Sequence, residues 1–355
     1  MKLFRKNKHQ SDLNEEAFSP IQRIKKIEGK LVPAFICNGG TYFFTDIEVY
    51  SDGIIEAWGA LDLDFFRSKL ASNWIAVNVP NEENISIHHL ASLKITDCIW
   101  RFDSNTFYDF VVGLLKGMNS KMQNLYNFFG EDTVQIGTTK YSKLPRSNGK
   151  PVRPGSDHYH YHNMITGRNY SVFFKEAPNI YYLVNISVFE DQSVIMDRLP
   201  AVIRTDIPGL KKMMEDQEVI TEISRGSKVM IYGLGEFVTE EVNAAIKVES
   251  LFGEIEDAVS ELNSKPTTSQ TCKSVYDDYL QNPTVQSREV LREAYEKVPE
   301  HLKVYILGDM DVKDIPIRMI IYGEEEIKKW NHYIIAVEKG YELPKINVPN
   351  PVDEI

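Results

Sequence analysis

The sequence predicts an α+β fold of two similar modules, each an antiparallel sheet with helices on one face, and a smaller C-terminal α/β segment. Apolar residues alternate over short runs that end at turn residues, which is typical of antiparallel strands. The pattern occurs twice, because aligning Phe35 with Phe174 also places Tyr42 on Tyr181 and matches a series of apolar positions beyond them. The matched positions predict a repeated core rather than a repeated reaction site.

Each module is expected to open with two strands joined by a turn. In the first module, Asn38-Gly39-Gly40 ends one strand, and Ser51-Asp52-Gly53 forms a hairpin turn because Asp and Gly tolerate positive φ. The expected strands of the first module cover residues 31–36, 42–50, 54–58, 74–79, 85–89 and 92–102, with helices at 63–71 and 105–118. Those of the second cover 170–175, 181–189, 193–197, 219–223, 229–232 and 236–245, with helices at 207–215 and 251–262.

The C-terminal segment is expected to combine helices at 274–280, 287–297 and 324–338 with two strands, Val304–Leu307 and Arg318–Tyr322. Prolines at residues 344, 349 and 351 disfavour helix and central strand, so the tail is expected to be extended. The predicted boundaries are a flexible basic arm (1–28), the first module (29–130), a basic Pro/Gly linker with a His-rich strand (131–168), the second module (169–263) and the C-terminal segment with its tail (272–355).

The composition is that of a soluble, acidic protein. The formal net charge of −11 argues against general nucleic-acid binding and suits a basic protein partner. Three widely spaced cysteines, no secretory signal and no run of about 18 apolar residues predict a cytoplasmic protein without a membrane span. The basic linker is the expected place for any nucleic-acid contact, through Lys140, Lys143, Arg146, Lys150 and Arg153.

One histidine-rich segment offers ligands for a metal. Alternate side chains of a strand share a face, so His158, His160 and His162 would point the same way and could hold Zn²⁺. Such neighbours stand about 6.5–7 Å apart, so three imidazoles reach one ion only if the strand bends. We therefore expect no closed metal site, and no cofactor is predicted.

Aromatic side chains are the candidate contacts with a protein partner. Two aromatic runs, at residues 42–44 and 181–182, occupy matching places, and in each run one side chain should face the core and its neighbour the outside. The candidate partner-binding residues are Tyr42, Phe44, Tyr182 and Trp330. If helices cover both faces of the sheets, these residues are simply buried.

Residues 32–40 (VPAFICNGG), 46–53 (DIEVYSDG), 322–327 (YGEEEI), 330–333 (WNHY) and 342–344 (ELP) together resemble a bacterial family of tandem domains of unknown function. The resemblance extends over most of the chain. It implies a neighbourhood of toxin–immunity or defence genes, and it implies no catalytic residue.

The sequence contains no Walker A motif, no GxSxG elbow and no HExxH motif, and no catalytic residue is assigned. These observations favour a non-enzymatic cytoplasmic binding protein, of immunity or defence type, that acts through protein–protein contact. Two alternatives stay open. One is a metal-dependent hydrolase or nuclease that uses His158, His160 and His162, and the other is a structural protein that associates with itself.

Overall fold

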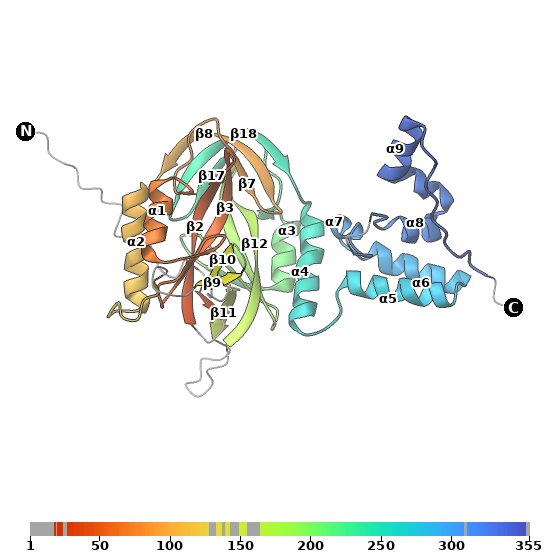
Figure 1. Ribbon diagram of the computed structural model, residues 1–355, viewed down its shortest axis with the longest axis horizontal. Coiled ribbons are helices and arrows are strands. Elements are labelled where there is room, and N and C mark those ends of the chain that lie inside the picture. Colours follow the sequence, from red (N-terminus) through yellow and green to blue (C-terminus); the bar gives the residue numbers. More distant parts are fainter. Residues whose placement is uncertain are drawn as a thin grey trace, which may run out of the picture. The chain divides into compact units, whose positions relative to one another are not determined.

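A computed structural model of the chain describes residues 18, 20–23, 27–127, 133–136, 139–142, 149–154, 164–308 and 311–352. The chain divides into two compact units, residues 1–248 and 249–355. The described strands belong to the N-terminal unit, whereas the C-terminal unit is built from helices (Figure 1). The chain is therefore mixed α/β, with one large sheet of 16 strands.

The first half of this sheet is built on a long hairpin. β2 (Ile27–Asn38) and β3 (Thr41–Tyr50) pair antiparallel across Gly39 and Gly40, whose φ angles of 61° and 81° favour glycine. β7 (Asn84–Ile87) lies parallel to β3, and β8 (Ala91–Trp100) returns antiparallel to β7. The short strands β4 (Ile55–Glu56), β5 (Ala60–Leu61) and β6 (Ile75–Ala76) extend this half.

Two helices pack on the first half. α1 (Leu63–Ala71) begins after Asp62, whose carboxylate accepts a hydrogen bond from the Phe65 N–H at 2.8 Å. α2 (Ser104–Met118) begins with a capping box formed by Asp103 and Thr106. Both helices bury one apolar stripe, and α2 lies against α1, β2 and β3 (Figure 1).

The second half has the same order of strand pairings. Its hairpin of β12 and β13 is antiparallel, β17 lies parallel to β13, and β18 returns antiparallel to β17. α3 packs on β14, β15 and β16. The elements are β12 (Met164–Ala177), β13 (Ile180–Phe189), β14 (Ser193–Asp197), β15 (Ile203–Asp206), α3 (Ile207–Glu215), β16 (Val219–Ile220), β17 (Lys228–Ile231) and β18 (Gly235–Ala244).

The two halves form one sheet and not the two separate sheets that the sequence suggests. β8 pairs with β18, and β2 connects through β1 (Pro20–Arg23) and β11 (Lys150–Pro154) to β12. Since β12 also pairs with β13, the strands β13-β17-β18-β8-β7-β3-β2-β1-β11-β12 close on themselves. Phe35, Phe44, Phe173 and Phe237 contribute from both halves to one hydrophobic core.

The prediction of purely antiparallel sheets is wrong for two strand pairs, β3–β7 and β13–β17, which are parallel. The alternation of apolar residues is the same in parallel and antiparallel pairs, so the pattern does not distinguish them. The register of the second hairpin also corrects the alignment. Phe173, not Phe174, lies opposite Leu183 as Phe35 lies opposite Phe44, because the register shifts between Lys175 and Ala177.

Residues expected to form a loose arm and an irregular linker contribute strands to the sheet. β1 pairs with β2 at the end of the expected arm, and β11 pairs with β1 and β12 within the expected linker. Val152 is buried, so the prediction of an exposed linker is wrong at this position. β9 (Thr133–Ile136) and β10 (Thr139–Ser142) form a separate hairpin. Pairing with distant strands overrides the local preference of Pro and Gly for irregular structure.

The C-terminal unit has its own core, which includes Cys272, Tyr279, Leu291 and Ile317. Its chain end lies extended beside α5 and α6, where the Tyr279 hydroxyl donates to the Pro349 carbonyl at 2.8 Å. The helices are α4 (Val248–Leu262), α5 (Thr268–Gln281), α6 (Val285–Glu296), α7 (Glu300–Lys303), α8 (Ile315–Tyr322), the 3₁₀ helix η2 (Glu324–Lys329) and α9 (Asn331–Lys339). No helix within the described ranges has the length and apolar character needed to cross a membrane.

The two strands predicted in this unit are wrong. Residues 304–307 form turns after α7, and Arg318–Tyr322 is the end of α8. A short apolar run is compatible with either a strand or a buried helix, and helical packing of Ile317, Ile320 and Ile321 in the core decides for the helix. Pro316 in the first turn and Gly323 after the last turn are the helix signals in the sequence.

The junction between the two halves of the sheet gives a first testable prediction. A Cβ atom at Gly235 would lie 2.5 Å from the Ile99 carbonyl oxygen, whereas a Cβ at Gly113 in α2 would meet no atom within 4 Å. Gly235→Ala is expected to destabilise the protein by about 1–3 kcal/mol through overpacking. Gly113→Ala, the matched control, is expected to stabilise it by about 0.5–1 kcal/mol. Denaturant unfolding measures both, and equal effects would contradict the close approach of β18 to β8.

Candidate functional site

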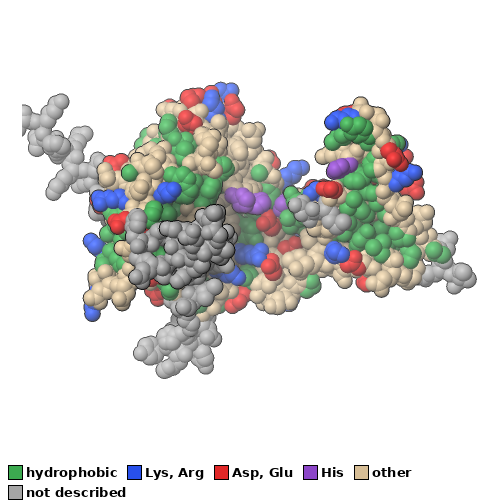
Figure 2. All heavy atoms as spheres, viewed as in Figure 1, with side chains coloured by type: hydrophobic (Ala, Val, Ile, Leu, Met, Phe, Trp, Pro, Cys, Tyr) green, Lys and Arg blue, Asp and Glu red, His purple; other side chains and the backbone are tan. Residues whose placement is uncertain are grey.

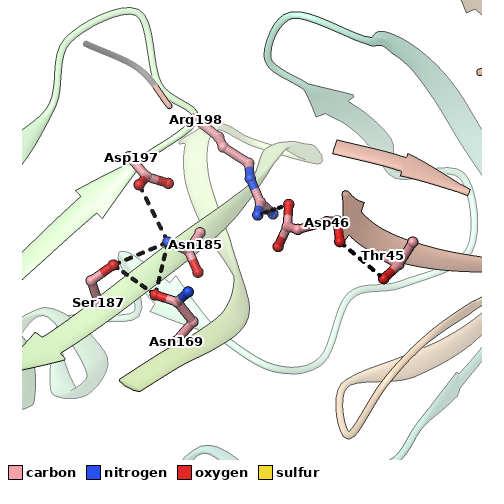
Figure 3. Close-up of polar contacts among 7 residues, drawn as sticks. All are labelled: Thr45, Asp46, Asn169, Asn185, Ser187, Asp197 and Arg198. Atoms are coloured by element: carbon pink, nitrogen blue, oxygen red, sulfur yellow. Dashed lines mark hydrogen bonds and ion pairs between the residues drawn. The ribbon is translucent and has the colours of Figure 1, made fainter. Parts of the chain in front are cut away.

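A buried ion pair connects the two halves of the sheet. Arg198 follows β14 in the second half, and its guanidinium donates to the carboxylate of Asp46 on β3 in the first half (Figure 3). The cation also lies 5.3 Å from the centre of the Phe44 ring. The face of β3 that carries Tyr42, Phe44 and Asp46 is therefore turned toward the second half.

Arg198 is held in an unusual way for a charged residue. Its side chain is 3% exposed, and its backbone φ of 60° lies in the left-handed region that side chains with a Cβ rarely adopt. Its Nη1 is buried and finds no hydrogen-bond acceptor among the described residues. Its ion-pair partner Asp46 lies 152 positions away in the chain. The buried position and the strained backbone of Arg198 are therefore maintained by contacts between distant segments.

A polar network continues from this ion pair into the second half. The Asn185 amide donates to the Asp197 carboxylate at 3.3 Å, and the Ser187 hydroxyl donates to the Asn169 amide oxygen at 2.7 Å (Figure 3). Burial raises the pKa of Asp197 to about 7, although the Arg198 cation opposes this shift. Asp197 therefore exchanges its proton near neutral pH, inside the unit.

This polar network is suited to joining the halves rather than to binding a substrate. Asp197 and Arg198 are both 2% exposed, so a molecule from solution cannot touch either side chain in this conformation. Asp46 and Asn185 occupy the same place in the two long hairpins, opposite Pro33 on β2 and Ser171 on β12. The network therefore lies where the two hairpins face each other.

A second candidate site is the opposite face of the sheet, along β13, β17, β18 and β8. Tyr182, Met230, Glu236 and Ile99 are successive neighbours across these four strands and share this face. Tyr182, Met230 and Glu236 are half-buried, and Ile99 is 64% exposed. Within the N-terminal unit, the described helices α1, α2 and α3 pack mainly on other strands.

A hollow of about 500 Å³ opens on this face. It is lined by residues 99–101 of β8 and the residues after it, and by residues 230–236 of the β17–β18 hairpin. Gly233 turns this hairpin with a φ of 82°, and Gly235 lets the hairpin lie close to Ile99 and Trp100 of β8. The hollow has the size of a pocket for one or two side chains of a partner.

Tyr182 lies on this face, and its phenol gives up its proton less readily than that of an ordinary tyrosine. Burial raises the pKa of the Tyr182 phenol, and the nearby carboxylates of Glu176 and Glu236 raise it further. Tyr182 is therefore a hydrogen-bond donor at physiological pH. Glu236 also pairs with Lys228 at 2.9 Å, so the face offers both a donor and charged groups beside its apolar centre.

A family model described as a domain of unknown function, DUF7638, matches residues 19–122 and 159–266, which together are more than half of the chain. The chain belongs to this family. A second model, the domain of unknown function DUF7639, matches residues 267–342. No curated protein and no solved structure matches the chain. The resemblance to a family with adjacent domains of unknown function is thus confirmed, and both candidate sites lie within the DUF7638 segments.

The predicted partner-binding aromatics have different positions in the structure. Tyr42 and Phe44 in the DUF7638 part are buried in the core and cannot contact a partner, which corrects the prediction. Tyr182 lies half-buried on the uncovered face. Trp330, in the DUF7639 part, is half-buried, and its indole N–H donates to the Asp311 carbonyl at 2.9 Å.

The histidine cluster lies outside the described residues, so the metal prediction for His158, His160 and His162 stays a prediction. Within the ranges that the structure describes, no three His, Cys, Asp or Glu side chains are grouped closely enough to hold a metal ion.

Of the five basic linker residues, some lie outside the described residues and others belong to the sheet. Lys143 and Arg146 lie outside the described residues, and only the backbone of Lys140 is described. Lys150 is exposed on β11. Arg153 is not a solvated linker cation, because its guanidinium pairs with Asp191 and donates from Nε to the Ser193 hydroxyl at 2.8 Å. Arg153 is thus held within the sheet, and the predicted nucleic-acid contact of the basic linker stays a prediction.

Sequence reasoning missed Asp197, Arg198 and Ile99. The available signal was an acid, Asp197, at the end of the alternating strand Ser193–Asp197, followed directly by a base, Arg198. No local signal marks Ile99, because its exposure depends on the bulge that shifts the register of β8 against β18 between Glu236 and Val238.

Proposed function

We propose that the chain is a non-enzymatic binding protein that contacts a protein partner through the uncovered face of β13, β17, β18 and β8. One observation supports this most strongly: four neighbouring strands present Tyr182, Met230, Glu236 and Ile99 beside a hollow, while the helices of the N-terminal unit pack mainly on other strands. An exposed apolar group on a sheet face, with a polar border, is typical of a protein-interaction surface.

The chemistry of this face indicates the kind of partner. An apolar side chain would enter the hollow between Ile99 and Met230, where it would lose its contact with water. A basic side chain next to it would approach Glu176 and Glu236, whose charges already act on Tyr182. The net charge of −11 would assist the approach of a basic partner from solution.

The first half of the sheet differs at the matching place, which supports a specific role for the second half. Ser86 on β7 lies beside Phe43 as Met230 on β17 lies beside Tyr182. Ser86 then faces Ser92, whereas Met230 faces Glu236. We propose that the halves are two copies of one module, of which the second has acquired the apolar binding face. The shared order of pairings and the two segments matched by DUF7638 support this.

The narrower part of the proposal is that the protein acts in the bacterial cytoplasm as an immunity or defence factor. Proteins of this type act by covering a partner, which a rigid sheet face with a preformed hollow would do without catalysis. This narrower proposal depends on the binding face, because a protein of this type needs a surface that recognises one partner.

The test replaces side chains of this face by charged ones. Ile99→Asp and Met230→Glu are expected to abolish binding of one or a few proteins that wild-type chain retains from a lysate of its source cells, measured by quantitative mass spectrometry. A buried charge without a partner costs several kcal/mol, so a loss of at least 10²-fold in affinity is expected for any protein captured.

Ser86→Glu is the matched control, because it introduces the same charge at the corresponding place of the first half. It is expected to leave the captured proteins unchanged. If Ser86→Glu removes the same proteins, or if neither Ile99→Asp nor Met230→Glu removes any, the binding face is wrong. Circular dichroism and thermal unfolding of each variant separate loss of binding from loss of folding.

A further inference from the structure

The last helix of the C-terminal unit exposes most of its apolar side chains. Along α9, Ile334 is 41% exposed, Ile335 44% and Val337 57%, and Tyr341 after the helix is 63% exposed. Ala336 is the only residue of α9 that is buried. Figure 2 shows hydrophobic side chains gathered on the visible face of this unit.

Such a helix is not expected to remain uncovered in water. A helix that is apolar on most of its circumference is normally buried, whereas an exposed helix has one polar face. Ile334 and Val337 are spaced as neighbours on one helical stripe, which lies away from the buried Ala336, and Tyr341 follows just after the helix ends at Gly340. Ile335 borders this stripe on the other side, so the apolar arc is wide enough to pack against another helix.

We propose that α9 is a homodimer interface, in which the α9 helices of two copies of this chain pack antiparallel about a two-fold axis. A two-fold contact uses the same patch on both copies, and helices that pair antiparallel at a small crossing angle bring the middle of one against the middle of the other. The uncharged run Tyr333–Val337 of one copy then contacts the same run of the other copy.

The charges of α9 suit this arrangement. The helix has no charged group between His332 in its first turn and Glu338 in its last turn. The last turn also carries Lys339, at the helix end where a cation is favourable. Antiparallel pairing about the middle of the helix brings Glu338 of one copy beside His332 of the other, and it brings Lys339 beside the uncharged Asn331, so no like charges meet.

The size of the patch indicates a weak dimer. The exposed parts of Ile334, Ile335, Val337 and Tyr341 amount to about 400 Å² per copy, which is about half of the ~800 Å² that each partner buries in a standard interface. Polar neighbours at the rim supply the remaining contact. An interface at this lower size limit is expected to dissociate in the micromolar range.

Sedimentation of the full chain between about 1 and about 200 µM tests the proposal. The wild-type chain is expected to change from monomer to dimer over this range. Ile334→Glu and Val337→Glu are expected to stay monomeric at all concentrations, because each would place two like charges at the centre of the two-fold contact. Val290→Glu on α6, 46% exposed in the same unit, is the control and is expected to dimerise like the wild type.

Hydrogen exchange of the α9 amides keeps the test independent of folding defects in the variants. In the wild-type chain, protection of α9 is expected to increase with protein concentration. A wild-type chain that stays monomeric to the highest concentration overturns the proposal. Protection that is strong at every dilution also overturns it, because another part of the same chain would then cover α9. Assembly beyond the dimer, or loss of the dimer in Val290→Glu, does so as well.

Discussion

Replacing Arg198 by methionine is expected to destabilise the N-terminal unit by about 3 kcal/mol. Removing one partner of a buried ion pair leaves the other charge without compensation, which costs about 3–5 kcal/mol. The lower end is expected here because the Asp46 side chain is still 21% exposed and keeps some hydration. Denaturant unfolding, followed by hydrogen exchange of β3 and β13 amides, measures the loss in this unit.

Two further variants identify the cause of this loss. Arg198→Lys keeps the charge and the left-handed backbone but loses the planar guanidinium over Phe44, so an intermediate loss is expected. Asp46→Leu combined with Arg198→Met removes both charges and is expected to cost less than Arg198→Met alone. If Arg198→Met changes the unfolding free energy by less than about 1 kcal/mol, Arg198 does not join the halves.

Asp197→Asn is expected to remove a pH dependence of stability and to stabilise the protein above neutral pH. The folded-state pKa of Asp197 is about 7 and its ordinary value is 3.8, because burial disfavours the carboxylate. The folded chain therefore holds this proton more tightly than the unfolded chain. Its contribution to stability is complete below pH 3.8 and is lost as the pH rises to about 7.

The size of this effect follows from the shift. A difference of about 3 pKa units corresponds to about 4 kcal/mol, so wild-type stability is expected to fall by several kcal/mol from this group between about pH 4 and pH 8. Asp197→Asn keeps the hydrogen-bonding shape without the charge. Unfolding measured across this range should show a flatter profile for this variant and a gain at pH 8.

Asp216→Asn is the control for this experiment, since Asp216 is an exposed carboxylate after α3 in the same half. Its variant is expected to follow the wild-type pH profile. A profile for Asp197→Asn that also parallels the wild type would mean that Asp197 is solvated or paired more strongly than its burial indicates.

Most of the regular elements could be predicted because their signals are local. The hairpin of β2 and β3 ends at the glycines that its turn requires, and α1 and α2 begin at the acids that cap them. The alternating positions of β3 are buried or half-buried as the pattern indicates. The helix α8 is predicted wrongly as a strand, because four consecutive apolar residues do not distinguish a strand from a buried helix.

The candidate sites were predicted only in part. Tyr182 is one of the predicted partner-binding residues, and its side chain lies half-buried on the outer face of β13. Tyr42 and Phe44 were named with it, but the same alternation of side chains turns them inward. A strand pattern separates two sets of residues without stating which set faces the core, and packing against the second half makes that choice.

By itself, the sequence determined the approximate places of most strands, turns and capped helices of the two halves, because those preferences act over a few neighbouring residues. Only the tertiary structure decided that β3 and β7 run parallel, that β8 joins β18 and that the ten strands close on themselves. The tertiary structure also decided the contact of Arg198 with Asp46, which lie 152 positions apart in the chain. Such pairings depend on which surfaces meet when the halves pack together, and the local pattern of either half is compatible with several partners.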